Sequence, residues 1–193
     1  MNAITQMITQ QLAGSAGRQI ATRLGVSEST ANMAVQVAVP LVVAALARNA
    51  AKPEGSEQLH QAIAQDHDGS ILDNLSGYLQ NPQQGNGAGI LGHVLGDQRA
   101  SVENNVAQAT GMDQNSAGSL MEIVAPLVMG AIGKTQQQNG LDPSGLAGYL
   151  GRQQREQAAA PGIMGMVSSM LDSNQDGSVT DDLARMAGGL FNK

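Results

Sequence analysis

The chain repeats itself at a fixed interval, and this repeat constrains its fold more than any other feature of the sequence. Residues 25–46 (GVSESTANMAVQVAVPLVVAAL) align without a gap on residues 111–132 (GMDQNSAGSLMEIVAPLVMGAI), an offset of 86 positions (111 − 25 = 86). The identical pairs are Gly25/Gly111, Ala31/Ala117, Pro40/Pro126, Leu41/Leu127, Val42/Val128 and Ala45/Ala131. We therefore predict a duplicated unit, with one copy at residues 1–86 and the other at residues 87–193.

Two shorter segments also recur, at other offsets. Residues 75–79 (LSGYL) resemble residues 146–150 (LAGYL), and residues 89–94 (GILGHV) resemble residues 162–167 (GIMGMV). Because these offsets differ, we expect the connecting loops to differ in length between the copies.

The composition indicates an all-α protein. There is no Trp, one Phe and two Tyr, so Ala, Leu, Val, Ile and ten Met must fill the core. Aromatic residues favour strands, and their scarcity argues against a sheet. The predicted fold is a duplicated multi-helix unit with helix-turn-helix-like corners and a C-terminal helix-loop-helix that resembles an EF-hand.

Helix boundaries follow from capping residues and breakers. Ser27 and Asp113 are predicted N-caps. Pro40 and Pro126 each interrupt an apolar run, and we expect each either to start a new buried helix or to fix a kink. Polar or Gly/Pro-containing segments at 81–87, 135–140 and 153–161 are predicted linkers or loops.

The most specific motif is a calcium-type loop at residues 172–182 (DSNQDGSVTDD). Asp172, Asn174 and Asp176 stand at positions 1, 3 and 5, Gly occupies position 6, and Ser178 offers its carbonyl at position 7. Position 12 is Leu183 instead of an acidic residue, so we expect Asp182 to close the site, with Asp181 as the alternative. The predicted cofactor is Ca²⁺, because Mg²⁺ requires stricter octahedral geometry.

Residues 64–74 (AQDHDGSILDN) are a degraded relative of this loop. The Asp68-Gly69-Ser70 core survives, but Ala64 stands where the first carboxylate is needed. We expect a metal-free turn held by Asp side-chain hydrogen bonds, with a second calcium site as the alternative.

Residues 20–31 (IATRLGVSESTA) resemble a helix-turn-helix corner, which would indicate DNA binding. The segment that would form the recognition helix, residues 28–37, contains no Lys or Arg, and the whole chain carries 10 basic against 16 acidic residues. DNA binding requires clustered basic groups. We therefore expect this corner and its repeated copy in the second unit to serve helix packing. We expect no nucleic acid as a partner.

No catalytic constellation is recognisable. His60, His67 and His93 are scattered, and His93 is expected in a core or boundary position. The chain has no Cys. The apolar run at 37–47 is shorter than the ~20 residues of a membrane span, so we expect a buried helix there. The first residues lack a signal-peptide pattern, which leads us to expect a cytoplasmic location.

The repeated Pro-Leu-Val segments, residues 89–96 (GILGHVLG) and the Asp-rich terminal loop together resemble the bacterial family catalogued as domain of unknown function 937. This resemblance implies a helical fold and no catalytic residues. The favoured hypothesis is a non-enzymatic protein that binds structural calcium and acts through a protein partner or self-association. One alternative is a nucleic-acid-associated regulator descended from helix-turn-helix modules. Another is an enzyme with an unrecognised site between the units.

Overall fold

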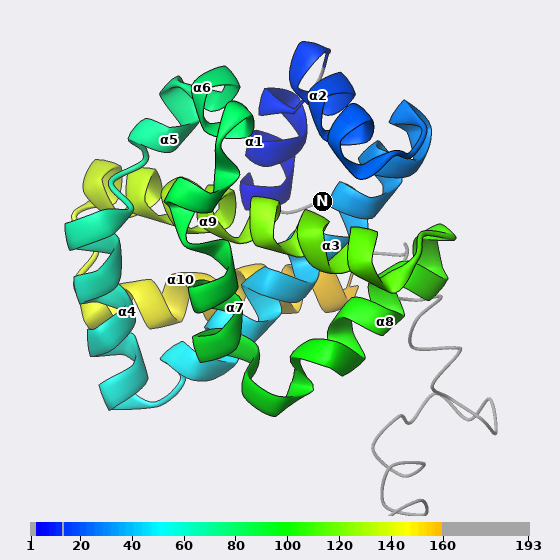
Figure 1. The fold of residues 1–193 in the computed structure, drawn as a ribbon. Helices are drawn as coiled ribbons and strands as arrows, with labels where there is room; N and C mark the ends of the chain where they lie inside the picture. The colour runs from blue at the N-terminus through cyan, green and yellow to red at the C-terminus, as the bar shows by residue number, and fades with distance from the viewer. Residues whose placement is uncertain (1–2, 13, 160–193) are drawn as a thin grey trace, which may run out of the picture.

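The structure is a computed structural model, and it describes residues 3–12 and 14–159. Within these residues every regular element is a helix, which confirms the all-α prediction for the part described (Figure 1). The α-helices are α1 (Ala3–Gln11), α2 (Ser15–Leu24), α3 (Glu28–Ala50), α4 (Pro53–Asp66), α5 (Ser70–Asp73), α6 (Leu75–Gln80), α7 (Gly87–Leu95), α8 (Arg99–Thr110), α9 (Gln114–Asn139) and α10 (Pro143–Ala159). Two 3-10 helices join them, η1 (Pro82–Gly85) and η2 (Gly96–Gln98).

The two longest helices, α3 and α9, run through Pro40 and Pro126 without ending. Of the two predicted alternatives, a new helix starting at each proline was therefore wrong, and a kink within each continuous helix stays a prediction. A proline inside a helix removes the hydrogen bond to the carbonyl four residues earlier, here that of Gln36 or Glu122. Both helices are buried over most of their length, and this packing offsets the missing bond.

The same local geometry precedes both long helices. Gly25 and Gly111 end α2 and α8 in the left-handed conformation, with φ of 67° and 69°. The predicted N-caps are confirmed, because the side chains of Ser27 and Asp113 each accept a hydrogen bond from the backbone N–H three residues later, at 3.0 Å. A residue without a side chain is favoured at each left-handed position.

The centre of the molecule is the crossing of α3 and α9, with the shorter helices around them (Figure 1). Small side chains dominate this centre: Ala38, Val39 and Val42 of α3 and Ala125 and Val128 of α9 are all fully buried. Small residues allow two helix backbones to approach closely. Buried residues from 4 to 150 form one hydrophobic cluster, so the two predicted units share a single core.

Two predicted loops are helical instead. Residues 135–139 continue α9, where Thr135 and Gln136 are buried, and residues 153–159 continue α10. The prediction of loops was wrong because it relied on the polar composition of these segments. Neighbouring helices cover part of them and stabilise the helical conformation. Residues 82–85 form a 3-10 turn between α6 and α7, close to the predicted break.

Both long helices are long and apolar enough to cross a membrane by length and composition. The argument that the apolar run is too short was wrong, because α3 extends it to 23 residues. The apolar windows of α3 and α9 are 61% and 83% buried within the fold, as in the core helices of soluble proteins, which meet the same criterion.

Candidate functional site

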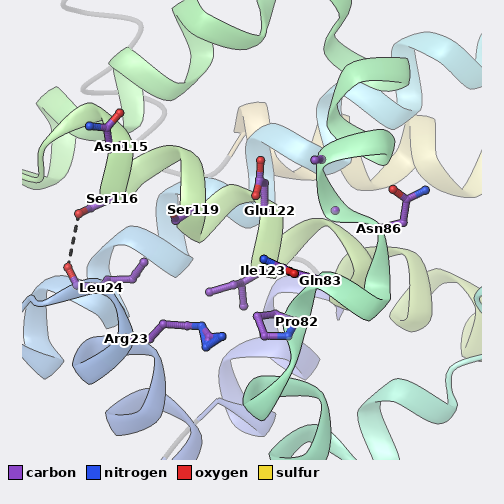
Figure 2. Close-up of a pocket in the computed structure, with 12 residues that line it drawn as sticks. Arg23, Leu24, Pro82, Gln83, Asn86, Asn115, Ser116, Ser119, Glu122 and Ile123 are labelled. Carbon is purple, nitrogen blue, oxygen red and sulfur yellow. Dashed lines mark hydrogen bonds between the residues drawn. The ribbon is translucent and has the colours of Figure 1, made fainter.

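A cavity of about 480 Å³ opens where four elements meet: the end of α2, the turn η1, the start of α7 and the first half of α9 (Figure 2). Its lining is mixed, with polar and apolar surface in similar amounts. The polar side chains come from Arg23, Gln83, Asn86, Asn115, Ser116, Ser119 and Glu122, and the remaining lining from Leu24, Pro82, Gly87, Ala88 and Ile123.

The turn before α7 shapes one wall of this cavity. Asn86 has a positive φ of 52°, unusual for a residue with a side chain, and it starts α7 without a side-chain cap. Gly87 lies so close to α9 that a Cβ atom there would overlap the carbonyl oxygen of Glu122. This is the carbonyl that Pro126 leaves without its helical donor. The start of α7 therefore fits against α9 because residue 87 has no side chain.

The acidic group of the cavity shares one arginine with a second glutamate. Glu122 accepts from Arg99 at 2.5 Å, and Arg99 also binds Glu103 at 2.6 Å and donates to the carbonyl of Ala88 at 3.2 Å. The hydrogen bond to Glu103 and the bond to Glu122 raise the pKa of Arg99, while burial acts in the opposite direction. Arg99 thus joins α7, α8 and α9 behind the cavity.

Arg23 is different. Within the described residues it forms no ion pair, and its side chain extends along the cavity toward Pro82 and Ile123 (Figure 2). A guanidinium offers five N–H donors in a planar fork and binds carboxylates well. Arg23 is therefore a cation without an ion-pair partner among the described residues, in a cavity whose other charged lining residue, Glu122, is bound to Arg99.

A hydroxyl fixes the α2 end of the cavity to α9. The hydroxyl of Ser116 donates to the carboxylate of Asp113 at 2.6 Å, and its oxygen also lies 3.4 Å from the carbonyl oxygen of Leu24. The hydroxyl bond and the capping bond lower the pKa of Asp113. The last turn of α2, which carries Arg23, is held in place by this contact.

The helix-turn-helix-like corner lies at α2 and α3. The exposed positions in the first turns of α3 are Glu28, Ser29, Asn32 and Met33, and the first basic residue of this helix is Arg48. A recognition helix reads bases and phosphates with polar and basic side chains. The corner offers no such set.

A second cavity, of about 740 Å³, lies beside the degraded loop at residues 64–74. Ala64 and Asp66 are still part of α4, and Gly69 is left-handed with φ of 96°. The carboxylate of Asp68 accepts from the backbone N–H of Ser70 at 2.9 Å, as expected for a turn held by an Asp side-chain hydrogen bond. No group of three or more His, Cys, Asp or Glu residues that could hold a metal occurs in residues 3–12 and 14–159.

The three histidines lie apart. His60 contacts the carbonyl of Leu141 at 3.1 Å, and His67 is half-buried at the end of α4. His93 is exposed on α7, so its predicted core or boundary position was wrong.

The predicted calcium ligands Asp172, Asn174, Asp176, Ser178 and Asp182 lie outside the described residues. The same holds for Asp181 and for residues 162–167. Sequence reasoning also missed the cavity beside Arg23. The Asn86-Gly87 pair, a common turn signal, is the only sequence feature that indicates part of its wall.

A family model described as "Bacterial protein of unknown function (DUF937)" matches residues 6–135. The chain belongs to this family. The DUF937 region runs from α1 into the last turns of α9, so it contains both proline-bearing helices and every residue that lines the first cavity. It ends before α10 and before residues 172–182, whereas the segments that resemble the family in sequence extend to the Asp-rich terminal loop. No curated protein and no solved structure matches the chain.

Proposed function

We propose that this DUF937 protein is a non-enzymatic binding protein that receives an acidic group of a protein partner in the cavity beside Arg23. The observation that carries this proposal is that Arg23 lines a cavity and forms no ion pair within the described residues. Glu122, the acidic residue of the lining, is already bound by Arg99. A partner carboxylate would form an ion pair with Arg23, and Gln83, Asn115 and Ser119 offer hydrogen bonds around it.

We further propose that residues 172–182 bind a structural calcium ion. The support is the order of oxygen-bearing side chains at loop positions 1, 3 and 5, followed by Gly177 and Ser178. In this proposal the ion organises the C-terminal segment, while the cavity beside Arg23 contacts the partner.

We also propose that the chain arose by duplication, with α1 to α4 corresponding to α7 to α10. Several pairs separated by 86 residues support this. Val26 and Met112 donate to the carbonyls of Ala21 and Ala107, at 3.0 and 3.1 Å. The side chains of Asn49 and Thr135 donate to the carbonyls of Ala45 and Ala131, at 3.0 and 2.9 Å.

A peptide-display selection tests the partner proposal. Random peptides selected on the full chain should be enriched in Asp, Glu or a free C-terminal carboxylate. Arg23→Gln should lose most of this binding, whereas Arg18→Gln should keep it, because Arg18 is an exposed arginine of the same helix outside the cavity. Enrichment that is equal for both variants, or that lacks acidic groups, would overturn the proposal. A homodimer in sedimentation that Arg23→Gln disrupts would identify a second copy as the partner.

A further inference from the structure

The outer face of α9 is covered, whereas the corresponding face of α3 is not. Pro126, Leu127 and Gly130 are buried. Pro40, Leu41 and Ala44 stand 86 residues earlier in the chain and are only half-buried. The difference continues one turn later, where Arg48 is exposed. A row of apolar side chains on α3 is thus left partly open in the described structure.

The cover over α9 is the segment that follows α4. The side chain of Ile71 packs on Gly130, where a Cβ atom would lie 2.5 Å from Ile71 Cγ2. Asp73 of the same short helix binds Lys134 at 3.0 Å. Residues 67–73 therefore hold α9 by one apolar contact and one ion pair.

The same motif occurs after α10. Residues 68–75 (DGSILDNL) align without a gap on residues 176–183 (DGSVTDDL), an offset of 108 (176 − 68 = 108). Five of the eight positions are identical: Asp68/Asp176, Gly69/Gly177, Ser70/Ser178, Asp73/Asp181 and Leu75/Leu183. The first segment follows α4 and the second follows α10, which is the helix that corresponds to α4 in the proposed duplication.

We propose that residues 176–183 pack on the open face of α3 as residues 68–75 pack on α9. This inference rests on the proposed duplication. It places Val179 on Ala44 and pairs Asp181 with Arg48, because these residues correspond to Ile71, Gly130, Asp73 and Lys134.

The residue types at the two places are complementary. Where α9 has Gly130 the covering residue is the larger Ile71, and where α3 has Ala44 the covering residue is the smaller Val179. Both pairs fill a similar volume, as close packing requires. The basic residue is kept as Lys134 or Arg48, and the acidic residue as Asp73 or Asp181.

The chain is long enough to reach this face. Sixteen residues (160–175) lie between Ala159 and Asp176, and an extended chain spans about 3.3–3.6 Å per residue. The starting point is also suitable, because α10 already packs against α3.

Disulfide formation tests the contact, since the natural chain has no Cys. Ala44→Cys is combined with Val179→Cys in the full chain, and the pair is oxidised with and without calcium. We expect an intramolecular disulfide in good yield, because residues 71 and 130 are in direct side-chain contact: a Cβ atom at residue 130 would lie 2.5 Å from Ile71 Cγ2. Gly130→Cys with Ile71→Cys is the positive control. Ser29→Cys with Val179→Cys is the negative control, because Ser29 is exposed at the other end of α3.

A second measurement probes the ion pair. In the Ala44/Val179 cysteine pair, Arg48→Glu should lower the rate of disulfide formation, and adding Asp181→Arg should restore it. Equal yields for the Ala44 and Ser29 pairs, or disulfides formed only between two chains, would overturn the docking. A solved structure in which α2–α3 and α8–α9 cross differently would instead overturn the duplication itself.

Discussion

The hydroxyl group of Tyr78 donates to the carbonyl oxygen of Ile123 at 2.9 Å, deep in the protein. Ile123 stands three residues before Pro126, in the turn of α9 that the proline deprives of a backbone donor. Burial raises the pKa of Tyr78, so this phenol stays protonated and able to donate. One side chain from α6 thus binds the backbone of α9 where its helical bonding is interrupted.

Replacing Tyr78 by Phe should therefore destabilise the protein. The change leaves a buried carbonyl without this donor, and we expect a loss of about 1–2 kcal/mol in the free energy of unfolding. Urea denaturation followed by circular dichroism would measure it. Tyr149→Phe is the matched control, because Tyr149 is only half-buried and its loss should be smaller. Equal losses for the two variants would show that the hydrogen bond of Tyr78 beside the proline turn adds nothing to the stability beyond what Tyr149 contributes.

Two glycines of α7 should respond in opposite ways to alanine. Gly87→Ala forces α7 away from Glu122, and we expect a loss of about 1–3 kcal/mol from overpacking. Gly92→Ala meets nothing within 4 Å and removes a flexible residue from a helix, so it should stabilise by up to ~1 kcal/mol. Thermal melting of both variants measures the contrast. If both variants change the melting temperature by the same amount and in the same direction, Gly87 is not the residue at which α7 approaches α9 most closely.

The stability of the protein should fall in mild acid through His67. Burial lowers the pKa of His67 from 6.5, and Asp66 and Asp68 oppose this only in part. The unfolded chain then binds the proton more readily than the folded one. The stabilising effect is complete above about pH 6.5 and is lost as the pH falls through the lower folded pKa. Denaturation midpoints between pH 7.5 and 5 should drop less for His67→Gln, whereas a variant of the exposed His93 should behave as the natural protein does.

Calcium should raise the melting temperature. Binding to the folded state stabilises by roughly 2.7 kcal/mol at a hundredfold excess over the dissociation constant. Because position 12 is Leu183, we expect a dissociation constant on the order of 10⁻⁶ M or weaker. Asp176→Ala should abolish the shift between chelator and excess calcium, and Asp68→Ala, in the degraded loop, should leave it intact. A melting temperature that does not change in millimolar calcium would contradict the proposal that residues 172–182 bind this ion.

The sequence predicts local features of this fold well and long-range ones poorly. The N-caps Ser27 and Asp113 are confirmed because capping depends on residues within one turn. The predicted starts at Pro40 and Pro126 failed because tertiary packing of α3 and α9 outweighs the local cost of an interior proline. The cavity beside Arg23 could not be predicted, since its lining comes from segments near 23, 86 and 119 that only the fold brings together.

The echoes between short segments show the same limit. Residues 75–79 and 146–150 are alike in sequence, but the first lie in α6 and the second near the start of α10. The two segments share the Gly-Tyr-Leu sequence and a helical conformation, and they lie in different helices. Similarity over five residues does not fix a place in the architecture, whereas the 22 gap-free positions of the long repeat coincide with matching caps.

The single core formed across α3 and α9 has a consequence for a broken chain. Neither residues 3–80 nor residues 87–159 form a complete hydrophobic core alone. Each long helix packs against helices that precede η1 in the chain and against helices that follow it. Gln83 and Gln84 are exposed in that turn. A protease that cut between them would therefore release no free piece, and two halves expressed as separate polypeptides should find each other and reassemble.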